Sequence, residues 1–165
     1  MLYLQSLNKS LHKILGENQD VILIGEDLLD PYGGAFKVSK GLSASYPGQV
    51  ISTPISEAGI VGSAVGMAMR GLKPIVEIMF GDFVALAADQ IVNHASKYNW
   101  MYNEKVTVPV LIRTPVGGRR GYGPTHSQSL ESMFMSVPGI DIIAPSLCHN
   151  PGEMLESLMN TIERP

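Results

Sequence analysis

Short apolar runs that alternate with helix-length segments constrain the fold of this chain more than any other feature of its sequence. The runs hold few polar residues, as is typical of strands that are buried on both faces of a sheet. They lie at Val21–Ile24, Val50–Ile51, Pro74–Ile78, Val108–Arg113 and Ile140–Ile143. Strands that alternate with helices predict an α/β fold with a mostly parallel central sheet flanked by helices.

The segments between these runs carry helical signals. In the first segment, leucine and isoleucine recur at helical spacing until Gly16, which favours a stop. The predicted helices are Leu2–Leu15, Ser56–Arg70, Asp82–Tyr98, Ser129–Ser136 and Asn150–Ile162. Ligands of parallel sheets bind beyond the carboxyl ends of the strands. The segments to search for a site are therefore Gly25–Asp27, the turn before Glu57, Met79–Phe83 and Arg113–His126.

The composition fits one domain and excludes several classes of partner. The chain has 165 residues, of which 45% are hydrophobic and only 16% charged, so part of its surface is expected to be buried against another protein. The net charge of -3 provides no broad basic field for nucleic acid or an anionic membrane.

Cysteine usage and the N-terminal residues indicate the compartment. Cys148 is the only cysteine, which excludes an internal disulfide framework and a cysteine cluster with metal-ligand spacing. We assign no metal ligands in this chain. The first residues lack the charged start and apolar run of a signal peptide, and no segment approaches about 18 consecutive apolar residues. The sequence predicts a cytoplasmic protein without a membrane span.

Glu57 opens a predicted helix that is rich in small residues. Ser56 is a natural N-cap for it, and Gly59, Gly62 and Gly66 lie on one helical face. Glycine costs about 1 kcal/mol relative to alanine at a helical position, so the presence of three glycines on this face requires an explanation. The reason is either tight packing inside the domain or the close approach of another helix or a flat cofactor. For Glu57 itself, these residues alone favour an ordinary first-turn acid that stabilises the helix start.

The segment from Pro115 to Gln128 combines glycines, two cations and a histidine. His126 has the chemistry of a proton donor or acceptor near neutral pH, and a turn histidine satisfied by local hydrogen bonds is an equally good interpretation. Arg119 and Arg120 either contact a substrate carboxylate or a partner's acidic surface, or they solubilise an exposed loop. The glycines form no phosphate-loop or dinucleotide fingerprint.

Phe83 and the helix that follows it allow two interpretations as well. The Phe83 ring either faces the edge of the sheet or packs in the core. Asp89, Gln90 and Asn93 share a helical face with Leu86, and we expect that face to be buried. Polar groups on a buried face predict an internal or intersubunit hydrogen-bond network.

Six motifs in register along almost the whole chain give a more specific signal. They are Gly25–Asp27, Tyr32–Val38, Thr53–Gly59, Asp89–Asn93, His126–Gln128 and Pro138–Gly139. Together they resemble the β subunit of 2-oxo acid dehydrogenase decarboxylases, a branch of the transketolase-like enzymes that use thiamine diphosphate. This resemblance favours functional interpretations of Glu57 and His126 over structural ones.

The resemblance implies a transketolase-like pyrimidine-binding domain over residues 1–165, with its cofactor between two subunits. In that family the carboxylate matching Glu57 hydrogen-bonds a ring nitrogen of the aminopyrimidine and so activates the cofactor. Phe83 would stack on the pyrimidine, while Ile55 and Met79 would help to wall its pocket. His126 would face the substrate and assist proton transfer or acyl transfer to a lipoyl group.

The same resemblance implies partners. The sequence has no Gly-Asp-Gly followed by asparagine, the family's signature for magnesium and diphosphate. Mg²⁺ is therefore expected on an α subunit that carries the diphosphate-binding domain, and the chain alone should be inactive. A lipoyl acyltransferase is the other expected partner, in a self-associating or hetero-oligomeric assembly. The family continues beyond the position of Pro165 into a further strand and a C-terminal domain, so we expect the chain to be truncated there or to be an unusually short subunit.

The implied function is that of an oxidoreductase of the pyruvate dehydrogenase type, which decarboxylates a 2-oxo acid and transfers the acyl group to lipoamide. One alternative is a split transketolase-like subunit that moves a ketol unit between sugars. The other is a non-catalytic assembly module that keeps the fold and the glycine-faced helix.

Overall fold

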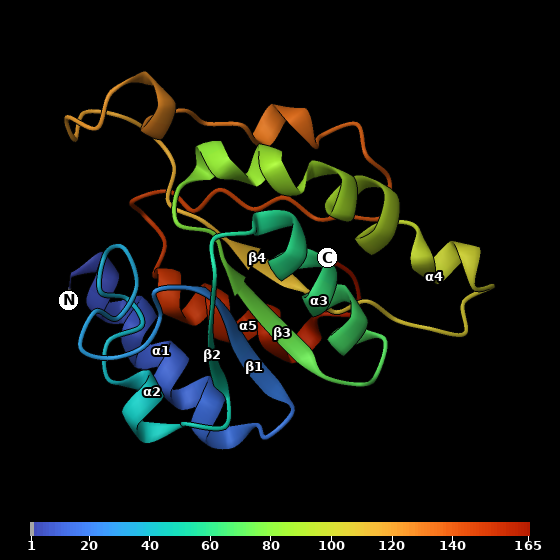
Figure 1. Cartoon of the computed structure of the whole chain (residues 1–165), viewed down its shortest axis with the longest axis horizontal. Helices are drawn as coiled ribbons and strands as arrows, with labels where there is room; N and C mark the ends of the chain where they lie inside the picture. The colour runs from blue at the N-terminus through green and yellow to red at the C-terminus, as the bar shows by residue number, and fades with distance from the viewer. Residues whose placement is uncertain (1) are drawn as a thin grey trace.

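One four-stranded sheet organises the chain, and all of its strand pairs are parallel (Figure 1). The computed structural model describes residues 2–165. The strands are β1 (Val21–Glu26), β2 (Val50–Thr53), β3 (Lys73–Glu77) and β4 (Leu111–Arg113), in the spatial order β2-β1-β3-β4. The predicted α/β fold with a parallel central sheet is therefore confirmed.

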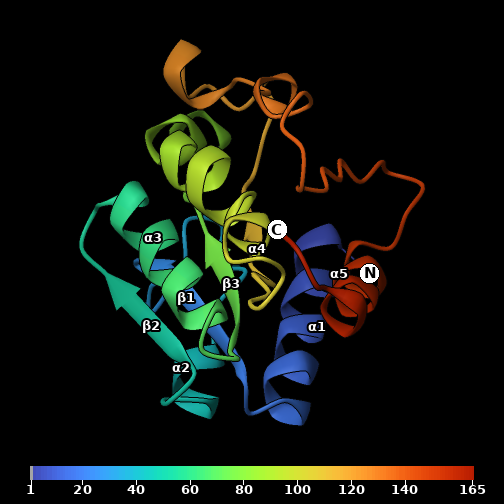
Figure 2. The same ribbon diagram turned by 90° about the vertical axis from the view of Figure 1, so that its right-hand side faces the viewer.

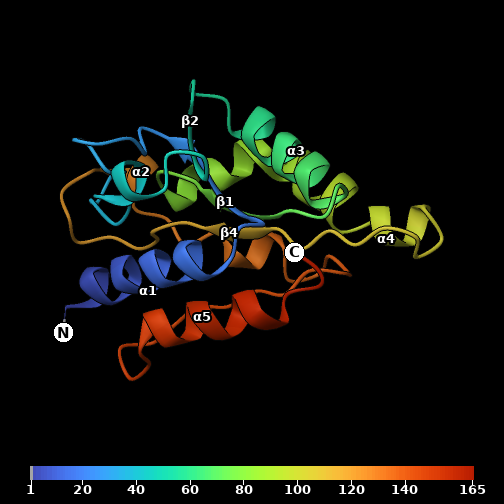
Figure 3. The same cartoon turned by 90° about the horizontal axis from the view of Figure 1, so that it is seen from below.

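Helices cover both faces of this sheet. The α-helices are α1 (Tyr3–Glu17), α2 (Leu42–Ser45), α3 (Glu57–Ala68), α4 (Tyr98–Met101) and α5 (Pro151–Thr161). The tighter 3₁₀ turns are η1 (Gly81–Ala87), η3 (Pro124–His126) and η4 (Glu131–Met133), and η2 (Gln90–Ala95) is a π-helix. Helices α1 and α5 lie on one side of the sheet, and α3 lies on the other (Figures 2 and 3). Across residues 2–165, no helix has the length and apolar character needed to span a bilayer.

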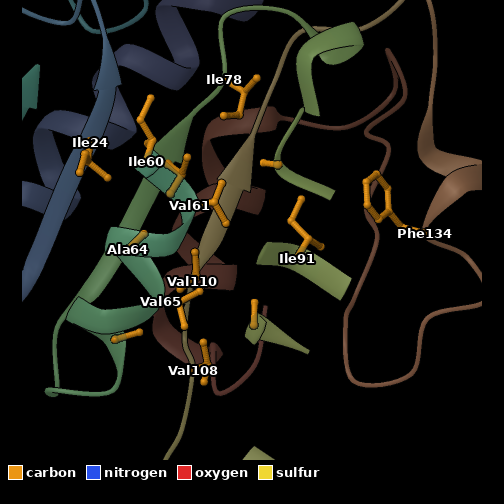
Figure 4. Packing of buried hydrophobic residues seen from close by; sticks show 14 residues of the cluster. Ile24, Ile60, Val61, Ala64, Val65, Ile78, Ile91, Val108, Val110 and Phe134 are labelled. Atoms are coloured by element: carbon orange, nitrogen blue, oxygen red, sulfur yellow. The ribbon is translucent and has the colours of Figure 1, made fainter. Parts of the chain in front are cut away.

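Neighbouring residues of β1 and β3 pack into two separate apolar cores. Leu23 and Ile75 belong to the core shared with α1 and α5. Ile24 and Val76 belong to the core shared with α3 and η2, which Figure 4 shows from close by. Each large aliphatic side chain that is fully buried stabilises the fold by about 1.5–3 kcal/mol. Burial on both faces explains why the strand sequences are apolar without alternation.

Polar contacts fasten α1 to α5. The Ser6 Oγ donates to Asn150 Oδ1 at 2.5 Å, and the Ser10 Oγ donates to Glu156 Oε1 at 2.5 Å. Gly152 lets the helices approach this closely, because a Cβ atom there would lie 2.6 Å from the carbonyl oxygen of Ser6. Asn150 is the N-cap of α5 and accepts hydrogen bonds from the first backbone N–H groups of the helix. The predicted helix over Asn150–Ile162 is thus confirmed.

The predicted strand at Ile140–Ile143 is wrong. This segment pairs with no strand, and the Ile142 and Ile143 side chains are 40% and 45% exposed. The Asp141 backbone N–H donates to the Pro165 carbonyl at 2.8 Å instead of to a neighbouring strand. An apolar run forms a strand only where a sheet edge accepts it, and here the run lies beside the end of the chain.

Two predicted helices differ in form. Only η4 (Glu131–Met133) is helical within the predicted helix Ser129–Ser136. The predicted helix Asp82–Tyr98 begins as the 3₁₀ turn η1 and continues as the π-helix η2. The wider winding of η2 shows at its end, where the Ser96 N–H donates to the Ile91 carbonyl five residues earlier, at 3.0 Å.

Candidate active site

The parallel strands deliver polar residues to one edge of the sheet. Glu26 ends β1 and pairs in register with Thr53, the last residue of β2. Glu57 follows at the first position of α3, and Thr114 directly follows β4. The carboxyl ends of parallel strands share one edge, so these side chains belong to the region where ligands of α/β sheets bind.

Three buried polar atoms at this edge have no hydrogen-bond partner. They are Glu26 Oε1, Thr53 Oγ1 and Thr114 Oγ1, and within residues 2–165 no other buried side-chain nitrogen or oxygen lacks a partner. Buried polar groups in folded proteins are almost always hydrogen-bonded, because an unmade bond costs about 1–3 kcal/mol. The concentration of unmade bonds at the carboxyl edge therefore indicates a site for a polar ligand.

Glu26 and Glu57 place two carboxyl groups at this site. Their residues are only 7% and 6% exposed. Burial raises the pKa of the Glu26 carboxyl, the charge of Glu57 raises it further, and the backbone N–H of Ser56 partly offsets both effects. Glu26 therefore keeps its proton to a higher pH than an ordinary glutamate. Ser56 is the N-cap residue as predicted, although its side chain makes no capping hydrogen bond.

Phe83 and His126, predicted from distant parts of the sequence, lie together. Their ring centroids are 5.1 Å apart at an interplanar angle of 82°. The Phe80 ring contacts both, at 6.0 Å from Phe83 and 4.8 Å from His126. Such edge-to-face contacts fix the plane of the imidazole. Phe80 was not among the predicted residues, although its position just after β3 could have suggested it.

The aromatic group continues into two loops. The Phe36 ring lies 5.6 Å from Phe80, and the Tyr122 ring lies 5.4 Å from Phe80. Together with His126 and Arg120, these rings line a shallow depression at the surface. Phe36 was not predicted to belong to the site, because only the folding of the loop after β1 brings it there.

A buried ion pair anchors the loop that carries Phe36. The Arg113 Nη1 donates to Glu77 Oε2, and the Ser39 Oγ donates to the same oxygen at 2.8 Å. Gly34 has a φ of 79°, and a Cβ there would lie 2.6 Å from Glu77 Oε1. The loop therefore packs directly on the carboxylate at the end of β3.

A second set of hydrogen bonds anchors the loop that carries His126. The Gln128 Nε2 donates to Asp82 Oδ1 at 2.7 Å, and the backbone N–H of Gln128 donates to the same carboxylate at 3.3 Å. Burial opposes ionisation of Asp82, but the hydrogen bonds from Gln128 outweigh it and lower the pKa of this carboxyl. Asp82 and Gln128 thus hold the His126 loop against η1.

The remaining predicted site residues flank this region. Met79 is half-buried two residues beyond the end of β3. Ile55 lies in the turn between β2 and α3, and its residue is 82% exposed. Their predicted contacts with a cofactor remain predictions.

The polar face of the helix after Phe83 is exposed, so the internal alternative is wrong, and an intersubunit hydrogen-bond network stays a prediction. Asp89, Asn93 and Leu86 are all exposed. The Asn93 Nδ2 donates to Asp89 Oδ1 at 2.7 Å, so the hydrogen-bond network exists but at the surface. The π-helical winding of η2 changes which residues face the core, which helical spacing could not anticipate.

Comparison with known proteins supports one family. The family model for the pyrimidine-binding domain of transketolase matches residues 1–164. The pyruvate dehydrogenase E1 component subunit beta of Leifsonia xyli is 39% identical over 153 residues, which cover 92% of this chain and 45% of that protein. The 2-oxoisovalerate dehydrogenase subunit beta of Pseudomonas aeruginosa is 38% identical over 164 residues, which cover 99% of this chain and 46% of that protein.

Solved structures support the same fold. A split-gene transketolase, described as an inactive beta4 tetramer, superposes with a TM-score of 0.73 at 21% identity and covers 98% of this chain and 48% of its own. The present chain spans about half the length of the curated relatives that it matches. The sequence match over nearly all residues and the shared parallel sheet lead to one conclusion: this chain belongs to the transketolase pyrimidine-binding domain family.

Proposed function

We propose that this chain supplies the pyrimidine-binding side of a thiamine-diphosphate-dependent 2-oxo acid dehydrogenase, which decarboxylates a 2-oxo acid and transfers the acyl group to lipoamide. The observation that carries this proposal is the buried Glu57 carboxyl, next to Glu26, at the edge where buried polar atoms lack partners. The relatives at 38–39% identity are β subunits of 2-oxo acid dehydrogenases. The likeness to transketolase structures at 21% identity bears on the fold alone.

The residues at the carboxyl edge fit an aminopyrimidine. Glu57 offers a carboxyl group to a ring nitrogen, and the unpaired hydroxyl of Thr53 can donate or accept a further hydrogen bond. Phe83 offers a flat ring for stacking. Ile55 and Met79 would form apolar walls beside it. This set combines a polar edge with apolar faces, as a heteroaromatic ring requires.

Glu57 would act by sharing a proton with that ring nitrogen. When bound, thiamine diphosphate supplies the carbon nucleophile and the electron sink for decarboxylation. Burial, and after it the charge of Glu57, raise the pKa of the Glu26 carboxyl, which favours the protonated form of Glu26 beside Glu57.

His126 would hold and move a proton on the substrate side. The Thr125 Oγ1 lies 3.0 Å from Nδ1 of His126, which leaves Nε2 for the substrate. The rings of Phe80 and Phe83 pack on the imidazole at steep angles and restrict its rotation. We assign His126 to proton transfer during decarboxylation or acyl transfer to the lipoyl group.

The proposed activity requires partners. The relatives are named as subunits, and we propose that an α subunit supplies the diphosphate and Mg²⁺ side of the cofactor site in a hetero-oligomer. A lipoyl acyltransferase would then receive the acyl group. The cytoplasmic location remains a prediction from the sequence.

Reconstitution tests this proposal. The full-length polypeptide is mixed with its α subunit, and thiamine-dependent decarboxylation of pyruvate and of branched 2-oxo acids is measured with lipoamide as acceptor. Glu57→Gln keeps the shape of the side chain and should lower kcat at least about 100-fold, the range of a lost proton-transfer group. Glu17→Gln is the matched control, because Glu17 is exposed at the far end of α1.

Three outcomes would contradict the proposal. Unchanged turnover in Glu57→Gln would remove Glu57 from the chemistry. Turnover of sugar phosphates but not of 2-oxo acids would favour the transketolase-like alternative. A stable complex with every α-like partner but no turnover would identify an assembly module.

A further inference from the structure

Arg120 is held over an aromatic ring and has no acidic partner within residues 2–165. Its Cζ atom lies 5.0 Å from the centroid of the Phe36 ring. The other arginines near acidic groups are paired, Arg113 with Glu77 and Arg164 with Asp141. A guanidinium that rests on an aromatic face is oriented by that face. Its N–H donors make no hydrogen bond to the described residues and remain available to a ligand.

Arg120 lines the same depression as His126. The Phe36 ring beneath the guanidinium contacts the Phe80 ring, and the Phe80 ring contacts the imidazole of His126 at 4.8 Å. Arg119, the neighbouring arginine, lines no part of this depression. A molecule that reaches His126 through this depression therefore contacts the Arg120 guanidinium, with the rings of Phe36 and Phe80 between Arg120 and His126.

We propose that Arg120 binds an anionic group at the end of the substrate remote from its keto group, so that the enzyme selects 2-oxo acids with a second carboxylate. The inference rests on the proposed function, since it takes His126 to face the substrate. A planar guanidinium matches a carboxylate through two parallel hydrogen bonds. Asp82, the acid in η1 that holds the His126 loop, is already engaged by Gln128.

The carboxylate that leaves as carbon dioxide is a poor ligand for this cation. That group loses its negative charge as carbon dioxide leaves, so a fixed cation on it would stabilise the bound substrate more than the transition state. The second carboxylate keeps its charge throughout the reaction. Binding that group lowers the energies of substrate and transition state alike, which increases selectivity without slowing the chemical step.

Matched substrates test the proposal in the reconstituted complex. Three 2-oxo acids of equal chain length end in a methyl, a carboxylate or a phosphonate group, and kcat/KM is measured for each. We expect the wild type to prefer the carboxylate-ended substrate over the methyl-ended one by about 10- to 100-fold, the range for a hydrogen-bonded charge. The phosphonate arm separates a carboxylate site from a general anion site.

Two neighbouring arginines provide the controls. Arg120→Gln should reduce the preference to within about threefold of unity, whereas Arg119→Gln, with the same change in net charge, should retain it. Arg120→Lys keeps the charge but loses the planar fork and should retain only part of the preference. Calorimetric titration with a non-reactive dicarboxylate of the same length should show the same order of affinities without any turnover.

Several results would overturn the inference. Turnover of 2-oxo acids without a preference for the charged end would reject it and leave the proposed function standing. An equal loss in Arg119→Gln and Arg120→Gln would show a long-range effect of charge. Weaker association of Arg120→Gln with the α subunit would show that the guanidinium contacts a partner's surface. Failure of the proposed function appears differently, as a complex that turns over no 2-oxo acid and binds no dicarboxylate.

Discussion

Replacing Arg113 by methionine should destabilise the fold, because it leaves a buried carboxylate without its cation. The Glu77 side chain is 7% exposed and the Arg113 side chain is 16% exposed, so water can replace little of the lost interaction. Methionine has a similar length and fills most of the space of the arginine stem. The main effect of Arg113→Met is therefore electrostatic, with the Ser39 hydroxyl as the remaining donor to Glu77.

The size of the effect follows from this burial. Removal of one partner from a buried ion pair costs about 3–5 kcal/mol. The partial exposure of Arg113 places its loss at the lower end, at about 3 kcal/mol. For a domain of this length each kcal/mol shifts Tm by about 2–4 °C. Arg113→Met should therefore lower Tm by roughly 6–12 °C.

Thermal unfolding of the full-length polypeptide, followed by circular dichroism, measures this shift. Arg164→Met is the control, because Arg164 and Asp141 form an exposed ion pair and exposed pairs contribute little. The double variant Arg113→Met with Glu77→Leu should recover much of the loss, since an apolar pair replaces the buried charge. A Tm for Arg113→Met within about 2 °C of the wild type, or a double variant no more stable than the single one, would refute the reasoning.

Two further predictions concern Glu26 and the glycines. Burial, and then Glu57, raise the pKa of Glu26 in the folded state. The protonated Glu26 therefore contributes its full stabilisation at pH values below the pKa of an unfolded glutamate, and this contribution is lost as the pH rises through the raised pKa. Glu26→Gln should therefore raise Tm at pH values above the raised pKa of Glu26 and change Tm little at lower pH. Melting curves recorded over a pH series measure this difference, and an equal shift of Tm at every pH would argue against the prediction. Gly152→Ala should destabilise by about 1–3 kcal/mol in urea unfolding, because its Cβ would meet Ser6. Gly66→Ala meets nothing within 4 Å and should stabilise by about 0.5–1 kcal/mol, and the reverse order would contradict the packing described.

The sequence predicted those parts of the fold that depend on local pattern. Apolar runs without alternation indicated strands buried on both faces, and Asn150 indicated the start of the last helix. The run at Ile140–Ile143 carries the same local signal but forms no strand, because pairing depends on a free sheet edge nearby. Local pattern cannot supply that information.

The sequence likewise predicted some features of the site and not others. The strand ends located the region, and the motif register selected Glu57 and His126. The contact of Phe36 with Phe80 depends on how a loop anchored by Glu77 folds over the sheet. The raised pKa of Glu26 depends on its burial and then on Glu57, at the start of α3. These relations join residues that are far apart in sequence, and only the tertiary structure sets them.

The strand register has a consequence for how the site can fail. Gly25 pairs with Glu77 and Glu77 pairs with Arg113, so one row of paired residues sets how β1, β3 and β4 are aligned at the carboxyl edge. A slip of one residue in any strand would turn its side chains to the opposite face. Misregistered molecules would retain most of their helices and much of their burial, yet they could not bring the two carboxyl groups together. Helical content and compactness would therefore not distinguish a misregistered sheet from the native one, whereas the placement of Glu26 beside Glu57 would.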